Sequence, residues 1–295
     1  MNQKILVREA KLEDKEAVLS FCRKTWEWGD YIPEVWDEWI KDPSGKIFVG
    51  VMDGKPVGIT NVVIIKEGEA WLRGARTHPE YRRRGVITAI TRKCLEFAAE
   101  KGARKARLVT ESTNIPAQKA LEKLGFKLVA TFLEWENENL EAEVSSFSSW
   151  AENEDLDKIW FYLQTSECFK KSHGLYTKLF TWISLDKKEI KRFVENKGCI
   201  KAELNGEILG LTLIDDETSR AWRENSIQIC YIDGNFESAV DMLKFLKTFC
   251  KESGIKKVYA FSCNHQPVVH AFEQLGFKKE DTEIVYEKIL DQTLP

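Results

Sequence analysis

The pattern of apolar and polar side chains along this chain predicts alternating strands and helices. Residues 72–88 read as a strand, a basic turn and a helix that begins at Gly85. The helix carries an apolar stripe with a period of 3.6 residues, formed by Ile87, Ile90, Cys94, Phe97 and Ala98. We expect it to end at Gly102, because glycine commonly terminates helices, and a strand over 106–110 follows.

The basic turn combines Arg82, Arg83 and Arg84 with Gly85 at the start of the predicted helix. Backbone N–H groups converge at a helix N-terminus, where the positive end of the helix dipole favours a phosphate. Glycine lets the backbone approach such a ligand closely. A basic turn before a helix can also serve only to keep the protein soluble. The surrounding sequence has to distinguish a phosphate-binding turn from such a solvated turn.

The second half of the chain repeats features of the first half. The hairpin signal Asp53-Gly54 reappears as Asn205-Gly206, and the pair Gly125-Phe126 reappears as Gly276-Phe277. Both correspondences have a spacing of about 150 residues, which is typical of an internal duplication. We therefore predict two copies of one α/β unit.

The duplication predicts a first domain over residues 1–138 and a second over residues 139–295. In the second copy, the stretch that corresponds to the basic turn holds Asp233 and Glu237 and no arginine. Carboxylates would repel a diphosphate, so the second domain is expected to lack a phosphate loop. Its expected roles are to pack against the first domain, to shape an acceptor cleft, or to form the contact of a homodimer.

The first domain resembles the GNAT superfamily of acetyl-CoA-dependent N-acetyltransferases over residues 5–135. The strand, the basic turn, Gly85, the helix and the next strand carry the resemblance, together with Asn114 and the Gly125-Phe126 pair. The resemblance implies an α/β (α+β) fold with two tandem GNAT-like units. Each unit would be a mixed, mostly antiparallel sheet flanked by helices.

Two positions depart from the family's pattern. Ile87 stands where a second glycine of the phosphate loop is usual, so Gly85 alone keeps the freedom of the turn. Leu121 stands where many of these enzymes carry a tyrosine that protonates the leaving thiolate. A leucine donates no proton, so water, another side chain or the stability of the thiolate itself must serve.

The resemblance also implies how acetyl-CoA would bind. The backbone of Ala75, Arg76 and Thr77 would pair with the pantetheine amides like an added strand, and Asn114 would contact the pantetheine arm. The diphosphate would be held by N–H groups of the loop and of the first helical turn, which are those of Arg83, Arg84, Gly85, Val86, Ile87 and Thr88.

Residues 25–39 have no counterpart in the second copy and hold four tryptophans and five carboxylates. In GNAT enzymes this region borders the acceptor pocket. Trp28, Asp30 and Tyr31 are therefore candidate contacts to a cationic or aromatic acceptor.

The stretch over residues 30–43 is also similar to the N-terminal region of histidine N-acetyltransferase-like enzymes, which acylate the α-amino group of a free amino acid. Trp36 and Trp39 in that stretch have helical spacing, which fits a place in the core as well as a place in a pocket.

An amine is mostly protonated at pH 7, so acetyl transfer needs a group that accepts a proton. Strand alternation places Glu69, Trp71 and Arg73 on one face, and Glu69 is the first candidate base. Glu111, just past the next strand, is the second; both also fit ordinary acids at strand ends. Arg73 either clamps the carboxylate of an amino acid or pairs with Glu69.

Composition describes an ordinary globular chain: 43% of residues are hydrophobic, 31% are charged, and the formal net charge is −3. That charge predicts no attraction to nucleic acid. The seven cysteines include no Cys-x-x-Cys pair and the four histidines lack ligand spacing, so no metal site is expected. No apolar run approaches the roughly 18 residues of a membrane span, and we expect a cytoplasmic location.

These observations predict an N-acetyltransferase that moves an acetyl group from acetyl-CoA to a primary amine by direct attack. The favoured acceptor is a free amino acid or a similar small amine. A protein N-terminus, as in ribosomal-protein alanine acetyltransferases, is the alternative within the same class. A non-catalytic acyl-CoA-binding sensor or scaffold is the alternative from another class.

Overall fold

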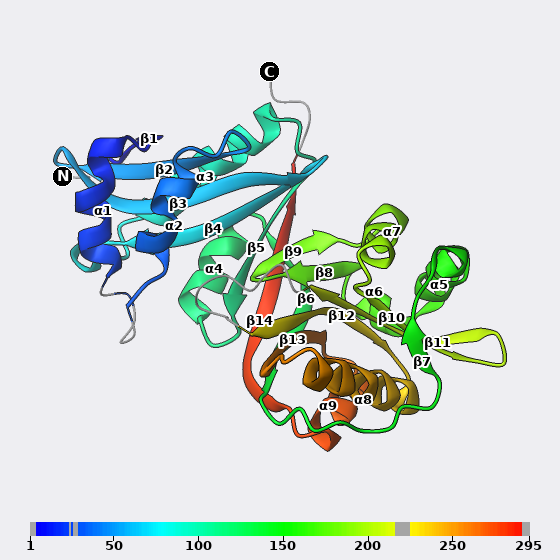
Figure 1. Ribbon diagram of the computed structural model, residues 1–295. Helices are drawn as coiled ribbons and strands as arrows, with labels where there is room; N and C mark the ends of the chain where they lie inside the picture. The colour runs from blue at the N-terminus through cyan, green and yellow to red at the C-terminus, as the bar shows by residue number, and fades with distance from the viewer. Residues whose placement is uncertain (1–3, 24, 26–28, 216–224, 291–295) are drawn as a thin grey trace. The chain divides into compact units, whose positions relative to one another are not determined.

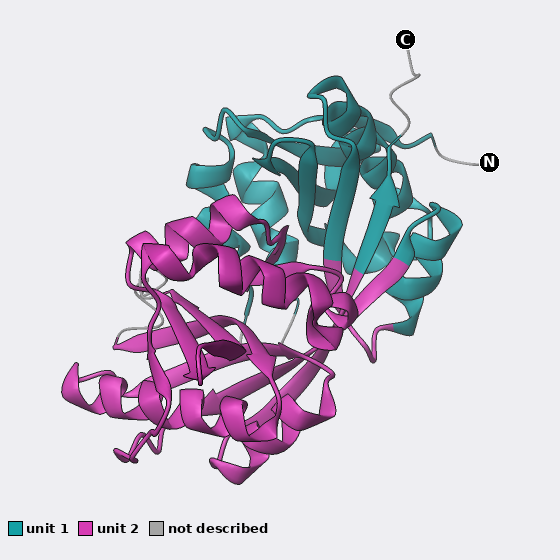
Figure 2. Cartoon of the chain, turned by 90° about the vertical axis from the view of Figure 1, so that its right-hand side faces the viewer, with its two compact units in different colours: residues 1–108, 115–127, 286–295 teal, residues 109–114, 128–285 magenta. Residues whose placement is uncertain are grey.

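Two compact units make up the chain (Figures 1 and 2). The structure is a computed structural model that describes residues 4–23, 25, 29–215 and 225–290. Unit 1 comprises residues 1–108, 115–127 and 286–295, and unit 2 comprises residues 109–114 and 128–285.

Unit 1 is built on a sheet in the order β1-β2-β3-β4-β5, in which β4 and β5 are parallel and the other pairs are antiparallel. Its elements are β1 (Leu6–Glu9), η1 (Leu12–Asp14), α1 (Lys15–Cys22), α2 (Ile32–Trp39), β2 (Gly45–Met52), β3 (Lys55–Lys66), β4 (Glu69–Thr77), η2 (Pro79–Tyr81), α3 (Val86–Glu100), β5 (Lys105–Glu111) and α4 (Ile115–Lys123).

Strand alternation along β2 divides the unit 1 core between the two faces of the sheet. Ile47, Val49 and Val51 belong to the buried cluster that contains the apolar side chains of α1 and α2. The ring of Phe48 points the other way and meets Phe97 of α3, with the ring centroids 6.0 Å apart. The α1–α2 pair and α3 therefore cover opposite faces.

Unit 2 has a sheet in the order β6-β13-β12-β11-β10-β7, with β12 and β13 parallel, and a separate β8-β9 hairpin. Its elements are β6 (Lys127–Asn137), β7 (Ser148–Trp150), η3 (Asn153–Asp155), α5 (Leu156–Thr165), α6 (Glu167–Lys171), β8 (Leu175–Lys178), β9 (Thr181–Ser184), α7 (Lys187–Glu195), β10 (Cys199–Leu204), β11 (Glu207–Asp215), β12 (Ser226–Gly234), α8 (Phe236–Glu252), β13 (Lys257–Cys263), α9 (Gln266–Gln274) and β14 (Lys278–Ile289).

The two units repeat the same local devices, which confirms the predicted tandem architecture. Each first helix is preceded by a short 3-10 turn with a capping box, formed by Lys11 and Asp14 in unit 1 and by Glu152 and Asp155 in unit 2. In each unit a long helix connects the two parallel strands, α3 between β4 and β5 and α8 between β12 and β13. The predicted α/β fold class is confirmed.

The last strand of the first half, and the end of the last strand of the second half, are assigned to the other unit. Residues 128–137 of β6 belong to unit 2, where β6 pairs with β13, although they follow α4 of unit 1 along the chain. Residues 286–295 belong to unit 1, which β14 reaches at Tyr286. The predicted domain boundary between 138 and 139 stays a prediction, since the compact units divide the chain at other places.

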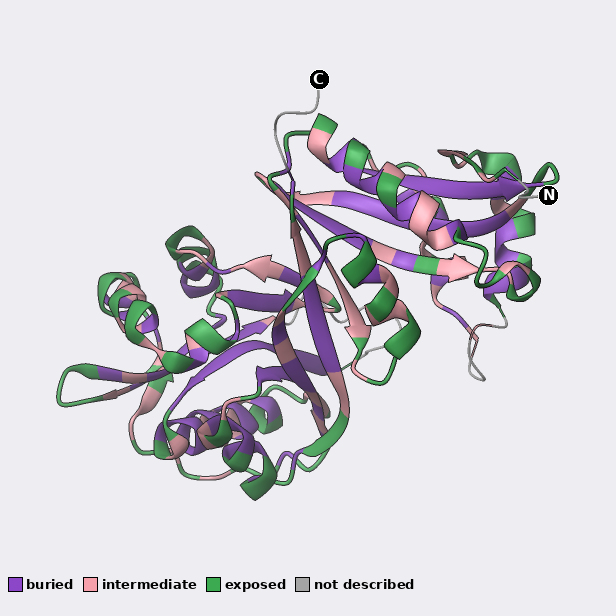
Figure 3. Ribbon diagram, turned by 180° about the vertical axis from the view of Figure 1, so that it is seen from behind, coloured by how far each residue is buried: buried purple, intermediate pink, exposed green. Residues whose placement is uncertain are grey.

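Many strand residues of both units are buried, and the helices bury one side and expose the other to solvent (Figure 3). Every residue of β12 is buried, and β2 is buried at all positions except Lys46. All seven cysteines lie in the core as free thiols. Among the described residues, no helix combines the length and the apolar character that crossing a membrane requires.

Candidate functional site

In unit 1, β4 and β5 separate after a short parallel pairing. The pairing joins residues 69–71 of β4 to residues 105–107 of β5. Beyond Trp71, β4 continues to Thr77 with β3 as its partner in the described sheet pairings. Among the described residues, the edge of β4 on the β5 side is therefore unpaired over residues 72–77, which leaves another extended chain free to pair there.

A β-bulge lies in this part of β4. Arg73 is opposite Asn61 and Arg76 is opposite Ile59, so β4 contains one residue more than β3 between these pairs. Gly74 has a φ of +68°, and a Cβ atom there would lie 2.7 Å from Trp39 Cζ3. Only glycine fits both this backbone conformation and the space beside Trp39. Gly74 was not among the predicted site residues.

The N-terminus of α3 carries no side-chain cap. Gly85 is the N-cap residue with a φ of +82°, and the first bond within the helix runs from the Ala89 N–H to the Gly85 carbonyl. The N–H groups of the first turn lack partners within the helix, as in any α-helix. By contrast, the Asn235 side chain caps α8 and accepts from the Ser238 N–H at 2.8 Å.

Two glycines let α3 approach the sheet closely. A Cβ atom at Gly58 would lie 2.5 Å from Val86 Cγ1, and one at Gly50 would lie 2.9 Å from the same atom. The first residue of α3 therefore packs directly on β2 and β3. This contact fixes the helix N-terminus relative to the end of β4, because Gly58 pairs with Thr77.

The turn between β4 and α3 is exposed and basic. Arg82, Arg83 and Arg84 are all exposed, and Arg83 has a φ of +62°. The Arg84 guanidinium lies 5.1 Å from the centroid of the Tyr81 ring. The structure therefore brings the predicted arginines, Gly85 and the start of α3 together in one loop, with positive charge at the positive end of the helix dipole.

Asp30 and Tyr31, two of the predicted acceptor contacts, both contact Arg76, which is a predicted cofactor contact. The buried Asp30 carboxylate accepts from Arg76 Nε at 2.6 Å and from Arg76 Nη2 at 3.2 Å. It also accepts from the Ile32 N–H at 3.1 Å, at the start of α2. The Arg76 guanidinium lies 5.4 Å from the ring centroid of Tyr31. Burial raises the pKa of Tyr31 above its usual value.

Arg73 is held on a second aromatic ring. Its guanidinium lies 4.4 Å from the centroid of Trp39, and its Nε donates to Asn61 Oδ1 at 2.8 Å. Trp36 and Trp39 are both buried, which confirms the interpretation of these two residues as core. Trp28 lies outside the described residues.

Glu69 takes part in a buried ion-pair network at the start of β4. Its carboxylate accepts from Arg107 Nη1 at 2.7 Å and lies 3.2 Å from Lys105 Nζ. The Nε of Arg107 donates to Glu287 of β14 at 2.7 Å, and the Arg107 side chain is only 2% exposed. Arg107 and Glu287 were not predicted as site residues, because Glu287 is distant in the sequence from β4 and β5.

Glu111 and Asn114 belong to unit 2, in the stretch over residues 109–114. Glu111 is the exposed last residue of β5, and its carbonyl accepts from the Asn114 N–H at 3.0 Å. Asn114 is exposed as well and directly precedes α4.

Residues 13–126, which span β2 to β5, the basic turn, α3 and all of α4, match the model of the acetyltransferase (GNAT) family. The predicted family resemblance is confirmed.

Two characterised relatives match a part of the chain. N-acetylaspartate synthetase of Xenopus tropicalis is 36% identical over 92 residues, which are 31% of this chain and 34% of that protein. Histidine N-acetyltransferase of Scomber australasicus is 26% identical over 90 residues, 30% of this chain and 27% of that protein. The chain thus matches about a third of the length of these relatives.

Solved GNAT structures share the fold over the whole chain. The GCN5-related N-acetyltransferase of Sphaerobacter thermophilus has a TM-score of 0.63 at 12% identity, covering 97% of this chain and 96% of that one. A tandem GNAT protein from the clavulanic acid biosynthesis pathway has a TM-score of 0.54 at 13% identity, covering 98% and 99%. These likenesses establish the tandem GNAT fold.

Unit 2 differs from the GNAT site at the end of β12, which corresponds to the end of β4. Asp233 is buried there and accepts from Tyr162, Ser166 and Tyr231 at 2.9, 2.6 and 2.7 Å. Burial raises the pKa of Asp233 above its usual value. In unit 2 only Asn235 separates β12 from α8, so unit 2 has no counterpart of the exposed basic turn.

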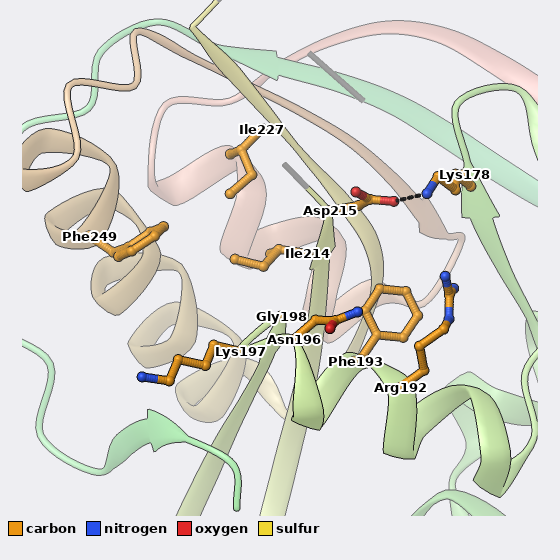
Figure 4. A pocket seen from close by; sticks show the side chains of 10 residues that line it. All are labelled: Lys178, Arg192, Phe193, Asn196, Lys197, Gly198, Ile214, Asp215, Ile227 and Phe249. Atoms are coloured by element: carbon orange, nitrogen blue, oxygen red, sulfur yellow. Dashed lines mark ion pairs between the residues drawn. The ribbon is translucent and has the colours of Figure 1, made fainter. Parts of the chain in front are cut away.

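A small cavity of about 70 Å³ lies elsewhere in unit 2 (Figure 4). Lys178 and Asp215 form an ion pair of 2.9 Å at its wall, and Ile214, Ile227 and Phe249 supply apolar surface. None of its lining residues was predicted as a site residue, and its volume suits a few water molecules at most.

Proposed function

We propose that this protein is an N-acetyltransferase that uses acetyl-CoA and binds it mainly through unit 1. The observation that carries the proposal is the uncapped N-terminus of α3, preceded by three exposed arginines, at the end of a strand with an unpaired edge. Such an arrangement provides N–H donors for a diphosphate and a strand edge for the pantetheine amides. It lies within the residues that match the GNAT family model.

The proposed cofactor contacts are mostly backbone contacts. Ala75, Arg76 and Thr77 would offer their strand edge to the pantetheine arm, and the residues from Arg83 to Thr88 would offer N–H groups to the diphosphate. The side chain of Arg76 has a separate function, since its ion pair with Asp30 ties the end of β4 to the start of α2. Asn114 is the proposed further contact to pantetheine.

A free amino acid is the proposed acceptor. The names of both characterised relatives describe acetylation of an amino acid, aspartate in one and histidine in the other. Arg73 is the proposed partner of the acceptor carboxylate, because its guanidinium is oriented by the Trp39 ring and by Asn61. Tyr31 is proposed to border the same acceptor, and the buried Asp30 is proposed to hold Arg76 in place beside it.

The proton released by the acceptor amine needs a receiving group, and Glu69 and Glu111 are the two candidates. Glu69 contacts Arg107 and Lys105, so taking a proton there would weaken a buried ion pair. Glu111 is exposed at the end of β5, and among the described residues it forms no ion pair. We therefore propose Glu111 as the proton acceptor and Glu69 as a positioning residue that holds β4 beside β5.

Leu121 is buried in α4 and provides no proton donor for the leaving group. Coenzyme A thiolate is a tolerable leaving group, so its departure is proposed to rely on water. Acetyl transfer by direct attack then needs no acetylated side chain. The carbon–sulfur bond of the thioester breaks as the amine nitrogen forms the new amide bond.

Product-detected turnover tests the proposed function. The protein is incubated with acetyl-CoA and with pooled amino acids, polyamines or peptides with free N-termini, and the products are identified by mass spectrometry. We expect one or a few acetylated amino acids. Acetylated peptides alone would indicate a protein N-terminal acetyltransferase, and tight acetyl-CoA binding without any product would indicate an acyl-CoA sensor. Either of these two results would overturn the proposal.

A further inference from the structure

Two cysteine thiols of unit 2 are in direct contact. The Sγ atoms of Cys168 in α6 and of Cys263 at the end of β13 lie 2.8 Å apart, although the two residues are 95 positions apart in the sequence. Both residues are buried. All seven cysteines are among the described residues, and no other two of them have their sulfur atoms in contact. This pair therefore differs from the isolated thiols elsewhere in the core.

The cysteine pair lies where the two parallel strands of unit 2 separate. The pairing of β12 with β13 joins residues 226–229 to residues 257–260. Beyond that pairing, the Cys168 thiol donates to the Ile232 carbonyl of β12 at 3.4 Å and contacts Cys263 of β13. Cys168 thus contacts both strands past the point where they pair. In unit 1 the corresponding opening is the edge of β4 that is proposed to receive the pantetheine arm.

Hydrogen bonds hold α6 in the position that brings the two thiols together. The Ser166 side chain caps α6, and its hydroxyl donates to the Asp233 carboxylate at 2.6 Å. At the other end of the helix, the Ser172 N–H donates to the Cys168 carbonyl at 2.8 Å. The Cys263 thiol donates to that same carbonyl at 3.6 Å. A disulfide bond is about 2.05 Å long, so the two sulfur atoms need to approach each other by only about 0.8 Å.

We propose that Cys168 and Cys263 form a disulfide bond when a small peroxide oxidises them, and that a thiol reductant reverses the reaction. One thiol loses its proton and attacks an oxygen of hydrogen peroxide. The O–O bond breaks, which leaves a sulfenic acid on the protein and releases one water molecule. The second thiol then attacks the sulfenic sulfur, so that the S–S bond forms as the S–O bond breaks and a second water molecule leaves. Two thiols are thereby oxidised, and one peroxide is reduced to two water molecules.

The position of the pair gives a small oxidant access but makes the reaction slow. Glu167, which precedes Cys168, and Asn264, which follows Cys263, are both exposed. The contact with Cys263, and then burial, hold the pKa of the Cys168 thiol well above its usual value. Because the thiolate is the reactive form, we expect oxidation to take minutes to hours. Both cysteines belong to unit 2, so the inference does not depend on the acetyl-CoA site proposed for unit 1.

Peptide mapping of the oxidised protein tests the proposal. The folded, intact chain is treated with hydrogen peroxide, free thiols are then alkylated, and tryptic peptides are analysed by mass spectrometry without reduction. The two cysteines lie in separate tryptic peptides, 159–170 and 258–278, each of which contains a single cysteine. We expect these two peptides to be linked, and the link to disappear after treatment with dithiothreitol. No link in the folded protein, or a link that forms only in urea or between other cysteines, would overturn the proposal.

Thermal unfolding of the oxidised protein gives a second measurement. A bond between residues 95 positions apart restricts the unfolded chain, so peroxide is expected to raise the midpoint of unfolding by about 5 °C. Cys168→Ala and Cys263→Ala are each expected to lose both the linked peptides and this rise. The matched control is Cys250→Ala, which removes a buried thiol of unit 2 outside the pair and is expected to keep both. A rise that persists in Cys168→Ala, or a folded control without the link, would contradict the assignment.

Discussion

Gly85 occupies a backbone conformation and a surface position that together suit a phosphate loop. Its φ of +82° is in the left-handed region, and a Cβ atom there would meet nothing within 4 Å. The space around Gly85 would admit a larger side chain. Glycine is favoured here because of the left-handed conformation and because a ligand has to approach the backbone closely. A side chain at this position would stand over the N–H groups of the first turn of α3.

Replacement of Gly85 by glutamate is expected to abolish acetyl-CoA binding while the fold is retained. The new carboxylate would occupy the helix N-terminus and repel the diphosphate. We expect the affinity to fall at least about a hundredfold, or ~2.7 kcal/mol, by isothermal titration calorimetry. The backbone strain costs only about 1–2 kcal/mol.

The matched control is Gly54→Glu in the β2–β3 turn. Gly54 has a similar φ of +74° and equally open surroundings. It is expected to show the same strain with normal acetyl-CoA binding. Unchanged affinity in Gly85→Glu would mean that the cofactor loop is wrongly assigned.

Arg107 neutralises two carboxylates at once, that of the buried Glu69 and that of the partly buried Glu287. Substitution by methionine keeps much of the side-chain volume but leaves both acids without their shared cation. We expect Arg107→Met to lower the free energy of unfolding by about 3–5 kcal/mol in urea denaturation. The more exposed pair of Lys15 and Asp37 supplies the comparison, since Lys15→Met is expected to cost less than about 1 kcal/mol. Equal small losses in the two variants would contradict the role given to Arg107.

At the scale of elements, the site depends on how closely α3 lies on the sheet. Gly58→Ala would place a Cβ atom 2.5 Å from Val86 Cγ1, and α3 would have to move. We expect acetyl-CoA affinity to fall about tenfold, with a loss of about 1–3 kcal/mol in stability. Adding Val86→Ala removes the clashing methyl group and should restore most of the affinity, measured by the same calorimetric titration. A single variant with normal affinity would show that the position of α3 is unimportant for the cofactor.

Local patterns predicted the elements around the site well. The helix after Gly85, the strand beside it and the hairpin turns at Gly54 and Gly206 follow from periodicity and from glycine chemistry, which act over a few residues. The bulge at Gly74 was not predicted, because it depends on the approach of Trp39 from another element. The sequence feature that could have indicated the bulge is the glycine inside the predicted strand.

At the scale of the whole molecule, the strands that cross between units could not be predicted from local patterns. Arg107 and Glu287 are separated by 180 residues, and nothing in either segment's sequence indicates the pairing. The duplication itself was visible, because equivalent turns recur at constant spacing. The assignment of β6 and of the end of β14 to the other unit leaves that spacing unchanged, so the spacing alone could not predict it.

The two units differ in how well the N-terminus of their long helix suits a diphosphate. Unit 1 has an uncapped helix N-terminus beside three arginines. In unit 2 the Asn235 side chain caps the corresponding helix, and the buried Asp233 precedes it. A diphosphate would have to displace the cap and approach a carboxylate there.

Calorimetric titration of the intact chain with acetyl-CoA tests this claim most directly, because it counts sites without a choice of acceptor. We predict one site per chain, and its loss in the Gly85→Glu variant. Two equivalent sites, or a single site that survives Gly85→Glu, would contradict the account.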